Sequence, residues 1–323
     1  MTVTRADLER CIDLVKGSVV DPRVGLFGPR STTWHIAREG VVFLAGGAAA
    51  LLQLGHPFVA YGVSEHSVTR EDTFGRFLRT FENVYAMLFG SLDRAVRSAR
   101  AVHTIHERVT GVIVTAAGPW PAGARYQAND EGALRWVFMT LIMNAVRAYE
   151  LVIHPLGDDE KDSYYAESRR FGLLFGLEDE DLPPTFSAFE RSYEDTLHSG
   201  SIVVTPPARE LSDYLLAPPH PALGLAWRWY TMMTASLLPE PLREGFGLSF
   251  GTREQARVET SIQAIRRAYP RIPARLRHVP AYLEAERRIA AGDAYVREPQ
   301  TSRPFLLKLL LRMSRAAVLQ QRA

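Results

Sequence analysis

The sequence contains a single cysteine, Cys11, among 323 residues. One cysteine excludes an intrachain disulfide and the Cys-x-x-Cys-His attachment of covalent haem, so we expect a reducing compartment, the cytoplasm. An excess of one charge is also missing, since the net charge is +2, and this argues against a nucleic-acid partner. The N-terminus lacks the apolar core and cleavage site of a signal peptide, so we do not expect export.

No apolar run is long enough to suggest a membrane span. The longest, residues 40–63, is interrupted by Gln53, His56 and Pro57 before it reaches the roughly 20 residues that a membrane helix requires. We therefore predict a buried core helix there. The length and the 46% hydrophobic content allow one large or two moderate domains.

Several catalytic motifs are absent as well. The chain has no phosphate-binding loop, no His-Glu-x-x-His zinc motif and no Glu-x-x-His pair of di-iron proteins. Residues 247–251 match the nucleophile elbow Gly-x-Ser-x-Gly, and His278 lies downstream. An elbow requires a buried strand before the serine, and residues 241–246 do not resemble one. We interpret this segment as a glycine-rich turn.

Hydrophobic periodicity predicts a mainly helical chain with at most one or two short strands. The predicted helices cover residues 5–16, 31–54, about 73–89, 91–110, 130–150, 158–175, 184–199, 208–215, 223–237, 253–269 and 282–291. Ser31, Thr32 or Thr33 can cap the second of these helices, Gly90 ends the third, and Asp130 can cap the fifth. Strand candidates are residues 112–115 and 201–205. Because strands do not alternate with helices, we predict an all-α fold with a single domain over residues 1–302.

The C-terminal segment, residues 303–323, is predicted to form a separate basic amphipathic helix. Lys308, Arg312 and Arg315 follow one side of an apolar stretch. This pattern is typical of a helix that contacts a membrane surface or docks on a partner. A terminal helix that packs on its own domain explains it equally well.

Histidines are concentrated between His56 and Gly111, which hold four of the nine in the chain. His103 and His106 are three residues apart and therefore neighbours on one helical face. His106 also falls on an apolar stripe with Val102. A lone histidine on such a stripe is more often a hydrogen-bonded core residue than a metal ligand, so periodicity alone leaves both roles open.

Two other groups of residues have an open interpretation. Arg76, Arg79 and Thr80 share a helical face that is either solvated or the wall of a polar cavity, because arginines and a hydroxyl suit an anionic or partly charged ligand. Residues 45–50, which include Gly46 and Gly47, have little side-chain volume, so a second helix or a flat ligand can approach closely.

A series of spaced motifs indicates a family when its members are taken together. It consists of Gly46-Gly47, Leu51-Leu52-Gln53, His56-Pro57, His66-Ser67, Arg76-x-x-Arg79-Thr80, Phe89-Gly90, His106-x-x-Val109-x-Gly111, Tyr126-x-Ala128-x-Asp130, Trp136-Val137 and Tyr149-Glu150. The series resembles the catalytic-domain family shared by the bacterial rubber oxygenase (latex clearing protein) and the fungal oxygenase of mycophenolic acid biosynthesis. The match is best over residues 30–167.

The resemblance implies a globin-like helical fold around a non-covalent haem b. It implies that His106 is the proximal iron ligand and that Arg76 and Thr80 lie on the distal side, where oxygen binds. Further candidates for contact with the cofactor are His66, His103, Gly46 and Gly47.

Arg79 departs from the family pattern. Rubber oxygenase has a lysine at this position that can ligate the iron, whereas an arginine stays protonated and is a very poor ligand. We therefore expect a distal site that is open or water-bound. We also expect a substrate other than polyisoprene, because the acidic residue proposed as base for rubber cleavage has no clear counterpart here.

The resulting prediction is a haem b-dependent oxygenase that uses dioxygen, or peroxide, on a small lipophilic organic molecule. Arg76 would polarise bound oxygen, Thr80 would donate or relay a hydrogen bond, and Arg79 would complete the site. The alternatives are a haem-binding sensor or carrier without turnover, and a cofactor-free helical protein that contacts a membrane or partner through residues 303–323.

Overall fold

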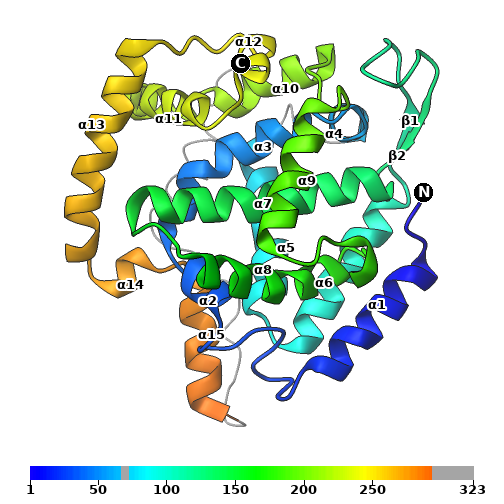
Figure 1. The fold of residues 1–323 in the computed structure, drawn as a ribbon, viewed down its shortest axis with the longest axis vertical. Coiled ribbons are helices and arrows are strands. Elements are labelled where there is room, and N and C mark those ends of the chain that lie inside the picture. Colours follow the sequence, from blue (N-terminus) through cyan, green and yellow to red (C-terminus); the bar gives the residue numbers. More distant parts are fainter. Residues whose placement is uncertain (67–72, 293–323) are drawn as a thin grey trace, which may run out of the picture.

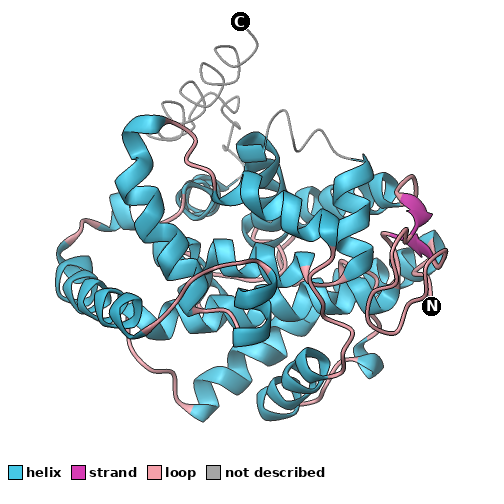
Figure 2. Cartoon of the chain, turned by 90° about the horizontal axis from the view of Figure 1, so that it is seen from above, coloured by secondary structure: helices cyan, strands magenta, loops and turns pink. Residues whose placement is uncertain are grey.

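The computed structural model describes residues 1–66 and 73–292, with the side chains of residues 73–79 excepted. Over these residues the chain is all-α with one small sheet, as predicted (Figure 2). The elements are α1 (Arg5–Ser18), α2 (Thr32–Ala37), η1 (Gly40–Ala45), α3 (Gly46–Leu54), α4 (Pro57–His66), α5 (Thr73–Phe89), α6 (Leu92–His106), β1 (Thr110–Val112), β2 (Arg125–Gln127), α7 (Glu131–Val152), α8 (Asp158–Leu173), η3 (Asp179–Asp181), α9 (Phe186–His198), α10 (Pro206–Leu216), η4 (Pro221–Leu223), α11 (Gly224–Ser236), α12 (Glu240–Gly245), α13 (Thr252–Ala268), η5 (Tyr269–Arg271), α14 (Ala274–Arg277) and α15 (Pro280–Ala291). The predicted C-terminal helix at 303–323 lies outside the described residues.

Helix α7 crosses the middle of the fold, and η1, α3, α8, α9 and α13 pack around it (Figure 1). Asp130 caps its N-terminus by accepting a hydrogen bond from the backbone N–H of Ala133 at 3.0 Å, as the sequence predicts. The helix is apolar on most sides, which is typical of a central buried helix. Trp136 joins two neighbours to it: its indole Nε1–H donates to the Leu52 carbonyl of α3 at 2.7 Å, and its ring stacks on Tyr193 of α9.

The prediction of one continuous helix over residues 31–54 was wrong. Ser31 caps a helix as expected, but α2 ends at Ala37 and the chain continues as η1 and then α3. Glu39 adopts an extended backbone between α2 and η1 and pairs with His278 in an isolated bridge. At Gly40 an added Cβ would lie 2.8 Å from the Arg277 carbonyl oxygen. These contacts with the C-terminal part of the chain override the local helical pattern.

Within the apolar run of residues 40–63 the chain bends sharply before Pro57 and continues as a second helix. A new helix, α4, begins at this proline, where a missing N–H costs nothing because the first N–H groups of a helix have no intrahelical acceptor. Within the described part of the chain no single helix is long and apolar enough to cross a membrane. Residues Gly40–Leu54 and Pro57–His66 meet that criterion only as a pair bent by 97°.

The strand predictions were partly wrong. The helix predicted over residues 91–110 ends at His106, and the strand expected at 112–115 begins earlier, where Thr110 of β1 pairs antiparallel with Gln127 of β2. Residues 201–205 form no strand, because Val203 donates only one ladder-like bond, to the Gly55 carbonyl at 2.7 Å, before α10 begins. The Gly-x-Ser-x-Gly segment at 247–251 is a turn between α12 and α13, as predicted, with Gly247 at φ 65°.

Candidate active site

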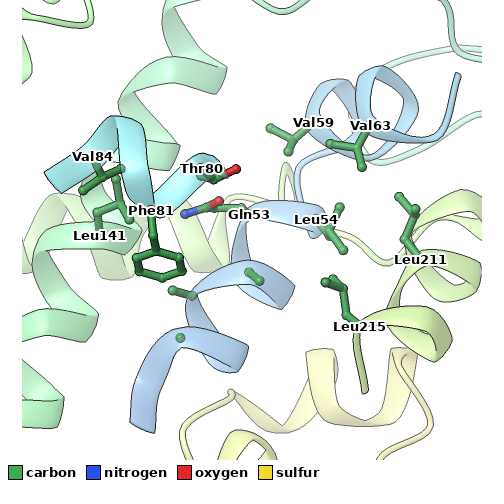
Figure 3. A pocket seen from close by; sticks show the side chains of 13 residues that line it. Gln53, Leu54, Val59, Val63, Thr80, Phe81, Val84, Leu141, Leu211 and Leu215 are labelled. Atoms are coloured by element: carbon green, nitrogen blue, oxygen red, sulfur yellow. The ribbon is translucent and has the colours of Figure 1, made fainter. Parts of the chain in front are cut away.

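An apolar pocket lies beside α3, with a volume of about 120 Å³ (Figure 3). Helix α3 contributes Gly46, Ala49, Ala50, Gln53 and Leu54 to its lining. The small residues of α3 therefore border open space, which is one of the two explanations that the sequence left open.

Four other helices complete the pocket. The side chains come from α4 (Val59 and Val63), α5 (Thr80, Phe81 and Val84), α7 (Leu141) and α10 (Leu211 and Leu215). An engineered cavity of about 150 Å³ holds one benzene molecule, and sites for drug-sized ligands measure about 300–1,000 Å³. This half-open pocket thus has room for a small organic ring.

Gln53 and Thr80 supply the polar side chains of this lining. The Gln53 amide Nε2–H donates to the Thr140 hydroxyl at 3.1 Å, and that hydroxyl donates to the Val137 carbonyl at 2.7 Å. In the view of Figure 3 the Gln53 carboxamide and the Thr80 hydroxyl lie near each other, while leucines and valines surround the rest of the pocket. The pocket is therefore polar on one side and apolar elsewhere.

An aromatic cluster supports the Phe81 side of the pocket. The Phe43 ring lies 5.0 Å from Phe81 and 5.9 Å from Tyr85, measured between centroids. The Tyr230 hydroxyl of α11 donates to the Phe43 carbonyl at 3.2 Å, and burial raises the pKa of Tyr230 to about 12. Tyr230 thus stays neutral at physiological pH and acts as a donor that fixes η1 against α11.

Gly46 and Gly47 have different surroundings although they are adjacent. Gly46 borders the pocket, whereas an added Cβ on Gly47 would lie 2.3 Å from the Thr234 hydroxyl oxygen of α11. Gly47 therefore permits a close contact between α3 and α11. It does not line the pocket.

Three of the four histidines between His56 and Gly111 have backbone partners that do not line the pocket. His56 is buried, and its Nδ1 accepts from the Phe58 N–H at 3.2 Å. His66 is exposed and hydrogen-bonds through Nε2 to the Thr110 carbonyl at 2.9 Å. His103 is buried, with Nε2 at 3.1 Å from the Val3 carbonyl oxygen. The structure thus ties His103 to the N-terminal segment and His66 to β1.

His106 has a different position, as the last residue of α6, which packs on α5. It is half-buried, and its Nδ1 atom is buried. The segment that follows it lies against α4, because Val109 is 3.1 Å from the place of an added Cβ on Gly62. The next residue of α4, Val63, lines the pocket. The chain just after His106 therefore lies beside α4, one of the helices that line the pocket.

The antiparallel packing of α5 on α6 relates His106 to the predicted distal residues. The Ser98 hydroxyl donates to the Asn83 carbonyl at 3.3 Å and to its side-chain oxygen at 3.1 Å. About two turns from this contact, α6 reaches His106 and α5 reaches Arg76. Thr80 lines the pocket, and the side chains of Arg76 and Arg79 lie outside the described residues.

The residues fit the predicted haem in donor chemistry. In the part of the chain that the structure describes, no group of three or more His, Cys, Asp or Glu could hold a bare metal ion. A haem iron needs only one or two protein ligands, because the porphyrin supplies the rest. His106, with its buried ring nitrogen, suits that role, and the apolar lining of the pocket suits an organic group.

Sequence reasoning assigned no role to Gln53. The available signal was its polarity, since it is the one polar residue in the apolar stretch of residues 40–55. A half-buried amide in such a stretch is stabilised by a hydrogen-bond partner, and here Thr140 of α7 provides it. That partner lies 87 residues away in the sequence, so the pairing could not be read from local spacing.

Comparisons with known proteins identify a family for this chain. Searches against curated proteins and against solved structures found no match. The model of the ER-bound oxygenase mpaB/B' and rubber oxygenase catalytic domain matches residues 33–268, which is well over half of the 323 residues. The match spans every helix that lines the pocket, together with His106 and the α5–α6 pair. The chain therefore belongs to the mpaB/B' and rubber oxygenase catalytic-domain family.

Proposed function

We propose that this protein is a haem b-dependent oxygenase for a small lipophilic substrate, with His106 as the protein ligand of the iron. The observation that carries the proposal is the position of His106 within a chain of an oxygenase family. His106 ends α6, the helix that packs on the pocket helix α5, and its Nδ1 atom is buried. When bound, haem supplies the redox-active iron that oxygen chemistry on an unactivated organic molecule requires.

The pocket residues would bind and orient the substrate. Val59, Val63, Leu211 and Leu215 offer apolar surface, which favours transfer of a lipophilic molecule from water. The same side chains exclude water from the reacting part of the substrate. The small α3 residues Ala49 and Ala50 leave room for it.

Thr80 would hold a polar atom at the pocket wall on α5. Its hydroxyl both donates and accepts hydrogen bonds, so it can hold a proton between oxygen and substrate. Arg76 occupies the position one turn before Thr80 on α5. We assign Arg76 the stabilisation of developing negative charge, and Arg79 a supporting positive charge, in keeping with the chemistry of guanidinium groups.

Oxygen consumption and isotope incorporation test the proposal. Protein reconstituted with haem and a reductant is incubated under ¹⁸O₂ with a panel of small lipophilic phenols, alcohols and alkenes. We expect substrate-dependent oxygen uptake and ¹⁸O in the product. Haem binding without oxygen uptake for any compound would indicate a sensor or carrier instead of an enzyme. Turnover with peroxide alone would indicate a peroxidase.

Residue controls make the assay specific. Thr80→Val should lower turnover while Thr80→Ser retains most of it, because only the hydroxyl is common to threonine and serine. Equal rates for Thr80→Val and the wild type would contradict the role assigned to Thr80. Iron analysis of the purified protein addresses the third alternative, since a cofactor-free interaction protein would contain no iron after haem loading.

A further inference from the structure

We infer that the pocket selects a small lipophilic molecule with a hydrogen-bond donor at one end, such as a phenolic or alcoholic hydroxyl, and that the Gln53 side-chain oxygen is the acceptor. The inference deepens the proposed function, because it takes the pocket beside α3 as the substrate site. It concerns a preference for one kind of ligand, which the family assignment does not specify.

The orientation of the Gln53 amide follows from the hydrogen-bond chain behind it. The Thr140 hydroxyl carries one hydrogen, and that hydrogen is donated to the Val137 carbonyl at 2.7 Å. Thr140 Oγ1 can then only accept toward Gln53, so the Gln53 group that faces it must be the NH₂, at 3.1 Å. A flipped amide would place two acceptors against each other.

This arrangement commits the other end of the amide to one chemistry. With Nε2 held against Thr140, Oε1 is the remaining heavy atom of the amide, and it can only accept hydrogen bonds. Thr140 is fully buried and belongs to the central helix α7, so the amide has a rigid support. A ligand group that donates therefore fits Oε1, whereas a ligand carbonyl or ether oxygen would oppose it and could pair only with the second hydrogen of Nε2.

The remainder of the pocket limits the ligand in a second way. Apart from Gln53 and Thr80, the lining is made of aliphatic and aromatic side chains and one glycine. A polar group elsewhere on the ligand would lose its water without a replacement, which costs more than one net hydrogen bond contributes. The volume of about 120 Å³ accommodates roughly one ring. The favoured ligand thus has one polar end and one compact apolar body.

The test compares phenol with toluene, which have the same size and differ only by a hydroxyl in place of a methyl group. Binding to the purified wild-type protein is measured by titration calorimetry at pH 7, where a phenol remains neutral. We expect phenol to bind at least about 5-fold more tightly than toluene, the size of a net hydrogen bond. Gln53→Met keeps the side-chain length but removes the acceptor, and it should reverse the preference in favour of toluene.

Thr140 provides a second measurement, because it acts through Gln53 as a positioning residue. Thr140→Val removes the group that fixes the amide and should reduce the phenol preference, and Thr140→Ser should restore it. A wild-type protein that prefers toluene, or binds neither compound, would overturn the inference. So would an unchanged ratio of the two affinities in Gln53→Met.

Failure of this inference is distinguishable from failure of the proposed function. The binding measurement requires no haem and no turnover, and it is repeated on the haem-loaded protein. A normal phenol preference without haem binding would leave the pocket assignment intact and remove the oxygenase proposal. Haem-dependent oxygen uptake without any phenol preference would do the opposite.

Discussion

The hydroxyl of Tyr269 donates a hydrogen bond of 3.0 Å to the carboxylate of Glu39, which lies 230 residues earlier in the chain. Arg277 Nε approaches the same Glu39 oxygen at 3.2 Å, and Arg38 Nε approaches the other oxygen at 3.4 Å. Glu39 itself is buried. The Glu39 carboxylate thus connects the segment before α3 to the C-terminal part of the chain. Helix α3 in turn contributes to the lining of the pocket.

Glu39→Gln should therefore destabilise the protein strongly. The change leaves the charges of Arg38 and Arg277, both mostly buried, without their counter-ion, and breaking such a pair costs about 3 kcal/mol or more in the free energy of unfolding. Urea denaturation measures the effect. The matched control is Asp13→Asn, which removes an exposed pair with Lys16 and should change stability by no more than about 0.5 kcal/mol. Similar effects for the two variants would contradict the role of Glu39.

His56 should give the protein a characteristic pH dependence. Burial lowers the pKa of His56 to about 4, below its ordinary value of 6.5. Between these two values the unfolded chain binds a proton that the folded chain does not, so the free energy of unfolding falls as the pH falls from 6.5 to 4. The loss amounts to about 3 kcal/mol, and above pH 6.5 the contribution is constant.

His56→Asn isolates this effect. Asparagine retains an acceptor for the Phe58 N–H, which His56 Nδ1 accepts at 3.2 Å, but does not titrate. We expect a flatter stability profile between pH 4 and 6.5, measured by chemical denaturation across that range. The exposed His66 supplies the control substitution, His66→Asn. An unchanged slope in His56→Asn would contradict this account, because it would mean that His56 binds its proton equally in the folded and the unfolded chain.

Gly47→Ala tests the close contact between α3 and α11. The added Cβ would lie 2.3 Å from the hydroxyl oxygen and 3.3 Å from the Cβ of Thr234, a fully buried residue. Overpacking of this kind typically costs 1–3 kcal/mol of stability. Because the clash is with one side chain, the double variant Gly47→Ala/Thr234→Ala should be less destabilised than the sum of its single variants.

Gly224→Ala is the matched control for Gly47→Ala, because an added methyl group has free space there. Nothing lies within 4 Å of an added Cβ on Gly224, at the start of α11, so Gly224→Ala should be neutral or stabilise by up to about 1 kcal/mol. A neutral Gly47→Ala would mean that α11 moves away at little cost.

Features with a local cause were predictable from the sequence. The cap at Asp130 and the end of α5 before Gly90 depend on residues within one or two turns, and both were expected. The break between α2 and α3 was not, because Glu39 is held by residues near position 277. The unpredicted pairing of Gln53 with Thr140 has the same cause: contacts between distant segments leave no periodic signal.

The candidate site shows the same division. Helical phase placed His106 on the stripe of α6 with Val102, and the structure leaves it half-buried at the end of α6. His103 was not placed on this stripe, yet it is the more buried of the two and hydrogen-bonds to the Val3 carbonyl. Its burial depends on the folded position of the N-terminal segment, about which the helical phase carries no information.

The absorption spectrum of the haem-loaded protein tests the central claim most directly. Wild-type protein, His106→Ala and the control His66→Ala are each loaded with haem, and circular dichroism establishes that all three are folded. We predict a Soret band for the wild type and for His66→Ala that is lost or strongly altered in His106→Ala, because the iron loses its protein ligand. A folded His106→Ala protein with an unchanged Soret band would contradict the assignment of His106.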